Sequence, residues 1–398
     1  MRIMDMMKVY HPQYYKKFIC DVNECKNNCC SRGWAIAVDP STYEKYMAVE
    51  GDFKNKFDGK LVPLKSSHSQ YRIDLDEKGE CSFLNEKGLC NIQLDHGFDA
   101  LCLTCRVYPR RLCHVGDSDE VFMQPSCEVA AKLILFEKGL MTLEDGEAYK
   151  GSFLAGDTIQ YSHRLELNRY TNHPSGLNIF WKLRSTTIGI LQSRQYSMRF
   201  RMLILLLFIQ ECADAMIGGQ DGTLIPLADS YVERLFGDYF DELYASMPQG
   251  VDREPAIVLD ILKDIHKKQN KNAKLFKEYL SITLEGFDIS EENWEVPNNF
   301  HEHYAKYYDT FFAANEQLFE NYIVHDVLSD GFPFTYARTG NIMQNYAALL
   351  AKYNIIEFLL VGASRRKMKF DKRLIVNMVA RFCCCYEHTT TGYLLSEE

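Results

Sequence analysis

The sequence contains no long hydrophobic run. Its longest apolar stretch, from Met202 to Ile209, is far shorter than the roughly 20 residues that a helix needs to cross a bilayer. The N-terminal residues MRIMDMMKVYHPQYYKKF also lack the unbroken apolar segment and the small-residue cleavage site of a secretory signal. We therefore expect a soluble protein that is located in the cytoplasm and has no membrane partner.

The chain also lacks an excess of positive charge. It has 45 Lys and Arg residues against 54 Asp and Glu residues, which gives a formal net charge of -9. Nucleic-acid backbones require a dense basic surface, so this balance excludes a general nucleic-acid binder. A basic run, RRKMKFDKR at residues 365–373, lies between two expected helices. It could contact an acidic partner or nucleic acid, but a solvated face is the favoured interpretation.

Cysteine, in contrast, is abundant. There are 14 cysteines, and ten of them lie between Cys20 and Cys127. Because cytoplasmic thiols are kept reduced, clustered cysteines indicate metal ligands or redox groups rather than a disulfide framework. Tetrahedral zinc and an iron–sulfur centre both use thiolates, and some of the cysteines could be buried small apolar residues. Only Cys102 and Cys105 in this region have the C-x2-C spacing that favours zinc.

The steep change in cysteine content predicts two domains, a cysteine-rich module at residues 1–140 and a helical domain at residues 141–398. In the first, residues 34–39 and 71–75 have the alternating or β-branched character of short strands. Beyond about residue 126, apolar residues recur at helical spacing in at least five long segments. The predicted fold class is mainly α, with an irregular cysteine-rich N-terminal module containing short strands, followed by an all-α domain.

The cysteine pattern resembles that of a known family. The segments CKNNCC, CSFLNEKGLCNI and CRVYP are similar to the motifs of cysteine-cluster proteins described as zinc- or iron-chelating. The fuller form, with FICDVNEC, RGWAIAVD and LFENYIVHDVLSDGFPF, resembles the flagellin lysine-N-methylase family over most of the chain. This resemblance implies a [4Fe-4S] cluster, S-adenosylmethionine as methyl donor and flagellin as the protein partner.

The resemblance also implies a set of metal ligands. The family's cysteines fall on Cys20, Cys25, Cys29, Cys30, Cys81, Cys90, Cys105 and Cys127. Cys102 and Cys113 do not match the pattern. Eight candidates exceed the four that one [4Fe-4S] cluster needs, so either some are structural or a second metal is bound.

The sequence assigns no catalytic residue and no donor-binding residue. It has no glycine-rich turn between a strand and a helix, so the usual methyltransferase nucleotide pocket is not visible. Aromatic walls that could hold a sulfonium and a neutral lysine are densest at residues 301–312 and 332–338, although core packing is the favoured role for both. The CCC run at residues 383–385 is a candidate remote ligand, although burial is the favoured interpretation. His96, His114 and His325 are candidate ligands or bases, but a hydrogen-bonded histidine is the favoured interpretation of each.

Three interpretations of function remain open from the sequence. The first is S-adenosylmethionine-dependent methylation of flagellin lysines, with the iron–sulfur cluster either assisting the transfer or serving a structural role beside a separate donor pocket. The second is a non-catalytic zinc or iron module fused to a helical interaction domain. The third is an iron–sulfur electron carrier.

Overall fold

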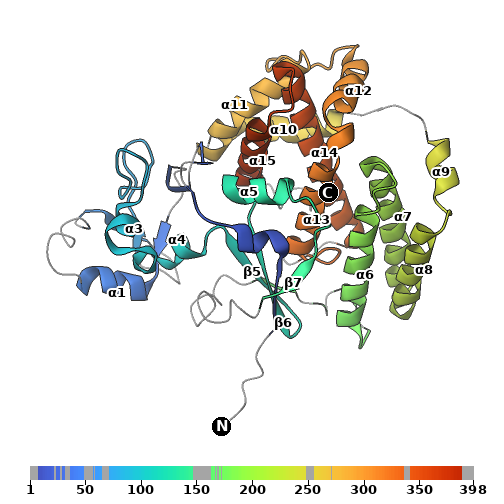
Figure 1. Cartoon of the computed structure of the whole chain (residues 1–398), viewed down its shortest axis with the longest axis horizontal. Helices are drawn as coiled ribbons and strands as arrows, with labels where there is room; N and C mark the ends of the chain where they lie inside the picture. The colour runs from blue at the N-terminus through green and yellow to red at the C-terminus, as the bar shows by residue number, and fades with distance from the viewer. Residues whose placement is uncertain are drawn as a thin grey trace, which may run out of the picture.

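A computed structural model gives the fold of the chain (Figure 1). The structure describes residues 8–21, 24–26, 29–31, 36–48, 57, 59–64, 71–146, 163–165, 167, 170–171, 173–247, 255–269, 271–335 and 341–387. Within these ranges the strands are β1 Lys8–Pro12, β2 Ile36–Val38, β3 Leu61–Pro63, β4 Tyr71–Ile73, β5 Arg110–Val115, β6 Ser118–Met123, β7 Leu143–Asp145 and β8 His163–Arg164.

Helices make up most of the described chain. The shorter helices of the N-terminal third are α1 Pro40–Ala48, α3 Asn91–His96, α4 Leu103–Val107 and α5 Glu128–Leu135. The remaining helices are α6 Gly176–Leu191, α7 Met198–Ile217, α8 Leu224–Phe236, α9 Asp241–Ser246, α10 Ala256–Lys267, α11 Lys271–Gly286, α12 Phe300–Phe311, α13 Gln317–Asp330, α14 Ile342–Lys367 and α15 Lys372–Glu387. The predicted fold class, mainly α with a small strand-containing N-terminal region, is confirmed.

The long helix α14 forms the centre of the helical body. It starts at a capping box, in which the Asn341 side chain accepts from the Gln344 N–H and the Gln344 side chain accepts from the Asn341 N–H. Among the described helices, it alone is long and apolar enough to cross a membrane, a property that the sequence interpretation missed. However, 78% of its most apolar 18-residue window is buried inside the protein, as in the core helix of a soluble protein. It packs against α7, α11, α12 and α13.

A five-stranded sheet, which the sequence did not predict, packs into the same core as the long helices. Its strand order is β7-β1-β6-β5-β8. β5 and β6 form a hairpin whose turn contains Gly116 at φ 64°, a value that favours glycine. β1 pairs in parallel with β6 across more than a hundred residues of sequence. Val9, Leu112 and Phe122 of these strands are buried with the helical residues in one large core.

A second, smaller core lies in the N-terminal third. Its three-stranded sheet has the order β2-β4-β3, and Ile36, Val38, Ile73 and Phe83 are buried there. In Figure 1 the helices α1, α3 and α4 form a small lobe beside the long helices. The two predicted strands at residues 34–39 and 71–75 are confirmed as β2 and β4. The boundary near residue 140 stays a prediction, because core packing alone does not show which segments fold independently.

A buried carboxylate links the helices of the large core, and its loss should be costly. Glu320 of α13 is fully buried and accepts hydrogen bonds from Arg201 of α7 at 2.7 Å and from Arg194 at 2.8 Å. Glu320→Gln should lower the free energy of unfolding by about 3 kcal/mol, because it leaves Arg201 buried without its full counter-charge. Urea denaturation measures the loss.

The matched control is Glu285→Gln, which breaks an exposed pair with Arg366 and should change stability by less than about 1 kcal/mol. Equal effects of the two substitutions would contradict this prediction.

A buried histidine should make stability depend on pH. His325 of α13 is buried, and its Nδ1 lies 2.8 Å from the Tyr14 hydroxyl. Burial, together with the charges of Arg111 and Lys352, lowers the pKa of His325 from 6.5 to about 3. The folded protein therefore keeps the imidazole neutral where the unfolded chain takes up a proton. The stability contribution is fully present above pH 6.5 and is lost as the pH falls toward 3.

The size of this effect follows from the linkage between protonation and folding. Between about pH 6 and pH 4, His325 should contribute a loss of about 1.4 kcal/mol in unfolding free energy per pH unit. Urea denaturation across this range should show that the free energy of unfolding falls more steeply with decreasing pH for the parent than for His325→Gln, which cannot titrate. Parallel pH profiles for the two proteins would show that His325 is not the responsible group.

Candidate functional site: a cysteine-rich lobe and an adjacent pocket

Local structure brings the cysteines of the lobe to the ends of short elements. Cys29 and Cys30 lie on a single 3-10 turn, and Cys90 and Cys102 immediately precede α3 and α4. The Cys81 N–H donates to the Cys30 carbonyl at 2.8 Å, which fixes the 3-10 turn beside the loop that carries Cys81. These positions gather six thiols in and around the small core, which we call the six-cysteine group: Cys29, Cys30, Cys81, Cys90, Cys102 and Cys105.

Polar side chains hold the surrounding loops in place. One Asp39 oxygen accepts the Leu103 N–H at 2.7 Å, and the other accepts the Thr42 N–H at 3.0 Å, so this carboxylate ties α1 to α4. The Asn85 side chain accepts the N–H groups of Lys87 and Leu89 and shapes the turn between Cys81 and Cys90. The NEKG segment therefore forms a turn, and its hydrogen bonds hold the chain that links two of the candidate ligands.

The sulfurs of the six-cysteine group form close pairs and no disulfides. All 14 cysteines are free. The Sγ atoms of Cys102 and Cys105 are 3.6 Å apart, and those of Cys29 and Cys30 are 3.9 Å apart. Within the described residues, no three His, Cys, Asp or Glu side chains are arranged closely enough to hold a metal ion. Four of the six sulfurs therefore lie in two close pairs, and in the described part of the chain the group is not a closed ligand set.

Electrostatic interactions connect the pairs. A hydrogen bond with Cys29, burial and the charges of Cys29, Cys81 and Cys90 raise the pKa of Cys30 far above its usual range. Burial raises the pKa of Cys81 to about 11. The hydrogen bond shared by Cys102 and Cys105 lowers the pKa of Cys102 and raises that of Cys105. Metal ions bind thiolates, so a bound cation would relieve this repulsion and release the protons.

The remaining predicted ligands, Cys20, Cys25 and Cys127, lie outside the small core, and Cys127 packs against the large core. Burial and the charges of Cys127 and Glu128 raise the pKa of Cys25 to about 12, and Cys20 adds to the same effect. Cys29 influences both Cys20 and Cys25, so it lies between the two sets. Five of the eight predicted ligands thus lie in the six-cysteine group. Its sixth member, Cys102, does not match the family pattern, although it has the C-x2-C spacing with Cys105. Cys20, Cys25 and Cys127 form a second set.

The donor atoms of the six-cysteine group fit a thiolate-bound metal in chemistry and partly in spacing. Tetrahedral zinc with Zn–S of about 2.3 Å places neighbouring sulfurs about 3.8 Å apart, close to the two observed pairs. In a [4Fe-4S] cluster each thiolate binds a different iron, so the ligand sulfurs stand farther apart than this. The two close pairs therefore match the sulfur spacing of tetrahedral zinc. A [4Fe-4S] cluster would bind only one sulfur of each pair, or the two sulfurs of each pair would have to move apart.

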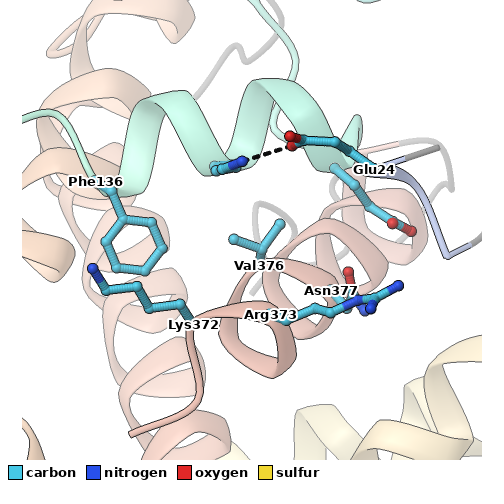
Figure 2. Close-up of a pocket in the computed structure, with 8 residues that line it drawn as sticks. Glu24, Phe136, Lys372, Arg373, Val376 and Asn377 are labelled. Atoms are coloured by element: carbon cyan, nitrogen blue, oxygen red, sulfur yellow. Dashed lines mark hydrogen bonds and ion pairs between the residues drawn. The ribbon is translucent and has the colours of Figure 1, made fainter. Parts of the chain in front are cut away.

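A pocket lies between α5 and α15, beside the second set of cysteines. It has a volume of about 480 Å³ and is lined by Glu24, Glu128, Lys132, Phe136, Lys372, Arg373, Val376 and Asn377. Figure 2 shows Phe136 and Lys372 at one end, Val376 on the floor, and Glu24, Arg373 and Asn377 at the other end. Cys127 immediately precedes α5, and the Lys26 N–H donates to Glu128 at 2.6 Å.

Sequence reasoning did not find this pocket. Its walls come from segments about 245 residues apart, which pack only in the folded chain. One signal was present, because the basic run at residues 365–373 ends at Lys372 and Arg373. Earlier members of that run form surface ion pairs, such as Arg366 with Glu285 at 2.7 Å. The favoured solvated face therefore describes the start of the run, while its end lines a cavity.

The aromatic groupings and the CCC run are core features. Tyr304 and Tyr308 of α12 are buried, and the Tyr304 hydroxyl donates to Glu357 at 2.8 Å. Phe332 and Phe334 are buried in the same core, whereas residues 336–338 lie outside the described residues. Cys383, Cys384 and Cys385 are also buried, which confirms the favoured interpretation.

Comparisons with known proteins point to one family. A family model described as the FliB lysine N-methylase C-terminal domain matches residues 184–394, which contain α7 to α15. A lysine-N-methylase of Salmonella typhimurium is 28% identical over 155 residues, covering 38% of this chain and 38% of that protein. A flagellar biosynthetic protein FliU of Salmonella muenchen is 28% identical over 151 residues, covering 37% of this chain and 88% of that protein.

The extent of these matches differs between the comparisons. A lysine-N-methylase of Salmonella choleraesuis gives the same 28% identity over 155 residues. The chain therefore spans little more than a third of the length of these two lysine-N-methylases. No solved structure matches the chain. Because the family model covers more than half of its 398 residues, the chain belongs to the family of the FliB lysine N-methylase C-terminal domain.

Proposed function

We propose that this protein transfers methyl groups from S-adenosylmethionine to lysine side chains of flagellin in the cytoplasm, before flagellin is exported. Family membership over α7 to α15 is the observation that carries this proposal. The similarity to two lysine-N-methylases and to a flagellar biosynthetic protein supports the reaction and the flagellar substrate. The resemblance of the cysteine motifs supports the same family independently of the helical region.

Methyl transfer to an amine nitrogen sets clear demands on the site. The nitrogen must be neutral, and at a pKa of about 10.4 only about one lysine in a few thousand is neutral at pH 7. The site must therefore exclude water from the substrate ammonium or accept its proton, because burial in an apolar environment favours the neutral amine. It must also hold the nitrogen about 3 to 3.5 Å from the methyl carbon.

We also propose that the cysteine-rich lobe holds a [4Fe-4S] cluster, with ligands drawn from Cys20, Cys25, Cys29, Cys30, Cys81, Cys90, Cys105 and Cys127. Cys30 and Cys105 each interact with three other thiols of the lobe, which supports their place in the ligand set. A bound metal would supply folding free energy to a lobe whose own core is small. Zinc is the alternative metal, and the close sulfur pairs favour it.

The experiment that tests the function combines metal analysis with a transfer assay. Protein purified without oxygen is analysed for iron, acid-labile sulfide and zinc, and is then incubated with flagellin and S-adenosylmethionine. A mass increase of one methyl group for each modified flagellin lysine is expected. An unmethylated product from protein with its full metal content would overturn the proposed activity. Zinc without sulfide would replace the [4Fe-4S] proposal, and zinc without methyl transfer would favour a non-catalytic interaction protein.

A further inference from the structure

The pocket between α5 and α15 carries a positive charge that the protein itself does not neutralise. Of its acidic residues, Glu24 pairs with Lys132 at 2.6 Å, and the buried Glu128 pairs with Arg381. Across the described part of the chain, no side chain forms a hydrogen bond or ion pair with the Arg373 guanidinium. The Lys372 ammonium lies over the Phe136 ring, 5.2 Å from its centroid. Two cations are therefore left to attract an anionic group of a ligand.

A buried amide also faces this pocket. Asn377 is only 6% exposed and lines the cavity, and within the described residues its side chain has no hydrogen-bond partner. The amide is reached from the cavity, so a ligand bound there can both accept and donate hydrogen bonds with this side chain. An asparagine amide presents a donor beside an acceptor, which is the pattern that pairs with the edge of an adenine. Val376 and Phe136 add apolar surface for a flat ring.

The size of the pocket also fits a small-molecule ligand. The cavity volume of about 480 Å³ falls within the range of about 300 to 1,000 Å³ that is usual for small-molecule sites. The pocket thus combines groups that suit a carboxylate and an adenine, both of which occur in S-adenosylmethionine.

We propose that the pocket between α5 and α15 binds S-adenosylmethionine, with Arg373 recognising the carboxylate and Asn377 recognising the adenine. This assignment rests on the proposed function, which requires a donor site. It also accounts for the missing glycine-rich turn, because the donor is held between the side chains of two helices.

The test measures binding rather than turnover, using the full-length protein with its metal. Calorimetry with S-adenosylhomocysteine should give at least about a tenfold weaker affinity for Arg373→Gln and for Asn377→Leu, because each loses hydrogen bonds to the ligand. A second probe, 5′-methylthioadenosine, has no carboxylate. Arg373→Gln should leave its affinity unchanged, while Asn377→Leu should weaken it. The matched control is Arg366→Gln, which removes a surface cation of the same basic run and should bind both probes like the parent.

The outcomes separate this inference from the function on which it rests. If the parent binds S-adenosylhomocysteine and both pocket variants bind it equally well, the donor site is elsewhere and the methyltransferase proposal stands. If the parent neither binds S-adenosylhomocysteine nor methylates flagellin, the function and the inference both fail. Circular dichroism and metal content that match the parent confirm that each variant is folded.

Discussion

Cys30→Ser should weaken metal binding strongly and destabilise the N-terminal lobe. Cys30 interacts with three other thiols of the six-cysteine group, because its sulfur lies 3.9 Å from that of Cys29 and its pKa responds to Cys81 and Cys90. A structural thiolate site contributes about 10 to 16 kcal/mol of apparent binding free energy, or about 3 kcal/mol for each of four ligands. Loss of one ligand should therefore weaken metal affinity by about a hundredfold.

Metal content after dialysis against a chelator gives the direct readout. Hydrogen exchange should show loss of protection in β2, β4 and α4, while the long helices stay protected, because the two regions have separate cores. The matched control is Cys212→Ser, which changes a buried thiol of α7 that belongs to the large core and should retain full metal content. Full retention by Cys30→Ser would move the ligand set toward Cys20, Cys25 and Cys127.

Gly286→Ala should destabilise the helical body severely. Gly286 ends α11 where this helix crosses α14, and an added Cβ would overlap the carbonyl oxygen of Gly362 and lie 2.6 Å from its carbonyl carbon. The obstacle is the backbone of α14, which cannot rotate away as a side chain can. We expect a loss of about 3 kcal/mol or more in the free energy of unfolding, which is a large part of the total stability of an ordinary domain.

A second glycine provides the matched control. Gly189 lies within α6, and a Cβ added there would meet no atom within 4 Å. Gly189→Ala should stabilise the protein by about 0.5 to 1 kcal/mol, because alanine has the better helix propensity. Thermal or urea denaturation should therefore show a lower free energy of unfolding for Gly286→Ala than for the parent, and a higher one for Gly189→Ala. If Gly286→Ala is as stable as the parent, the close approach of α11 and α14 is wrong.

The sequence by itself determined the local structure of this protein. Apolar residues at three- and four-residue spacing identified the long helices, and the residues around Ile36 and Tyr71 identified two strands of the lobe. These features depend on neighbours within a few positions, so a pattern in the sequence is sufficient to predict them. The number and crowding of cysteines also predict thiolate chemistry.

The tertiary structure decided which of these local elements meet. It paired β1 with β6, buried the CCC run, and brought together the sulfurs of Cys29 and Cys30 and those of Cys102 and Cys105. It also turned Arg373 and Asn377 of α15 toward α5, although the two helices are far apart in sequence. Such contacts result from the packing of whole faces against one another, and a single sequence does not show which distant faces will pack together.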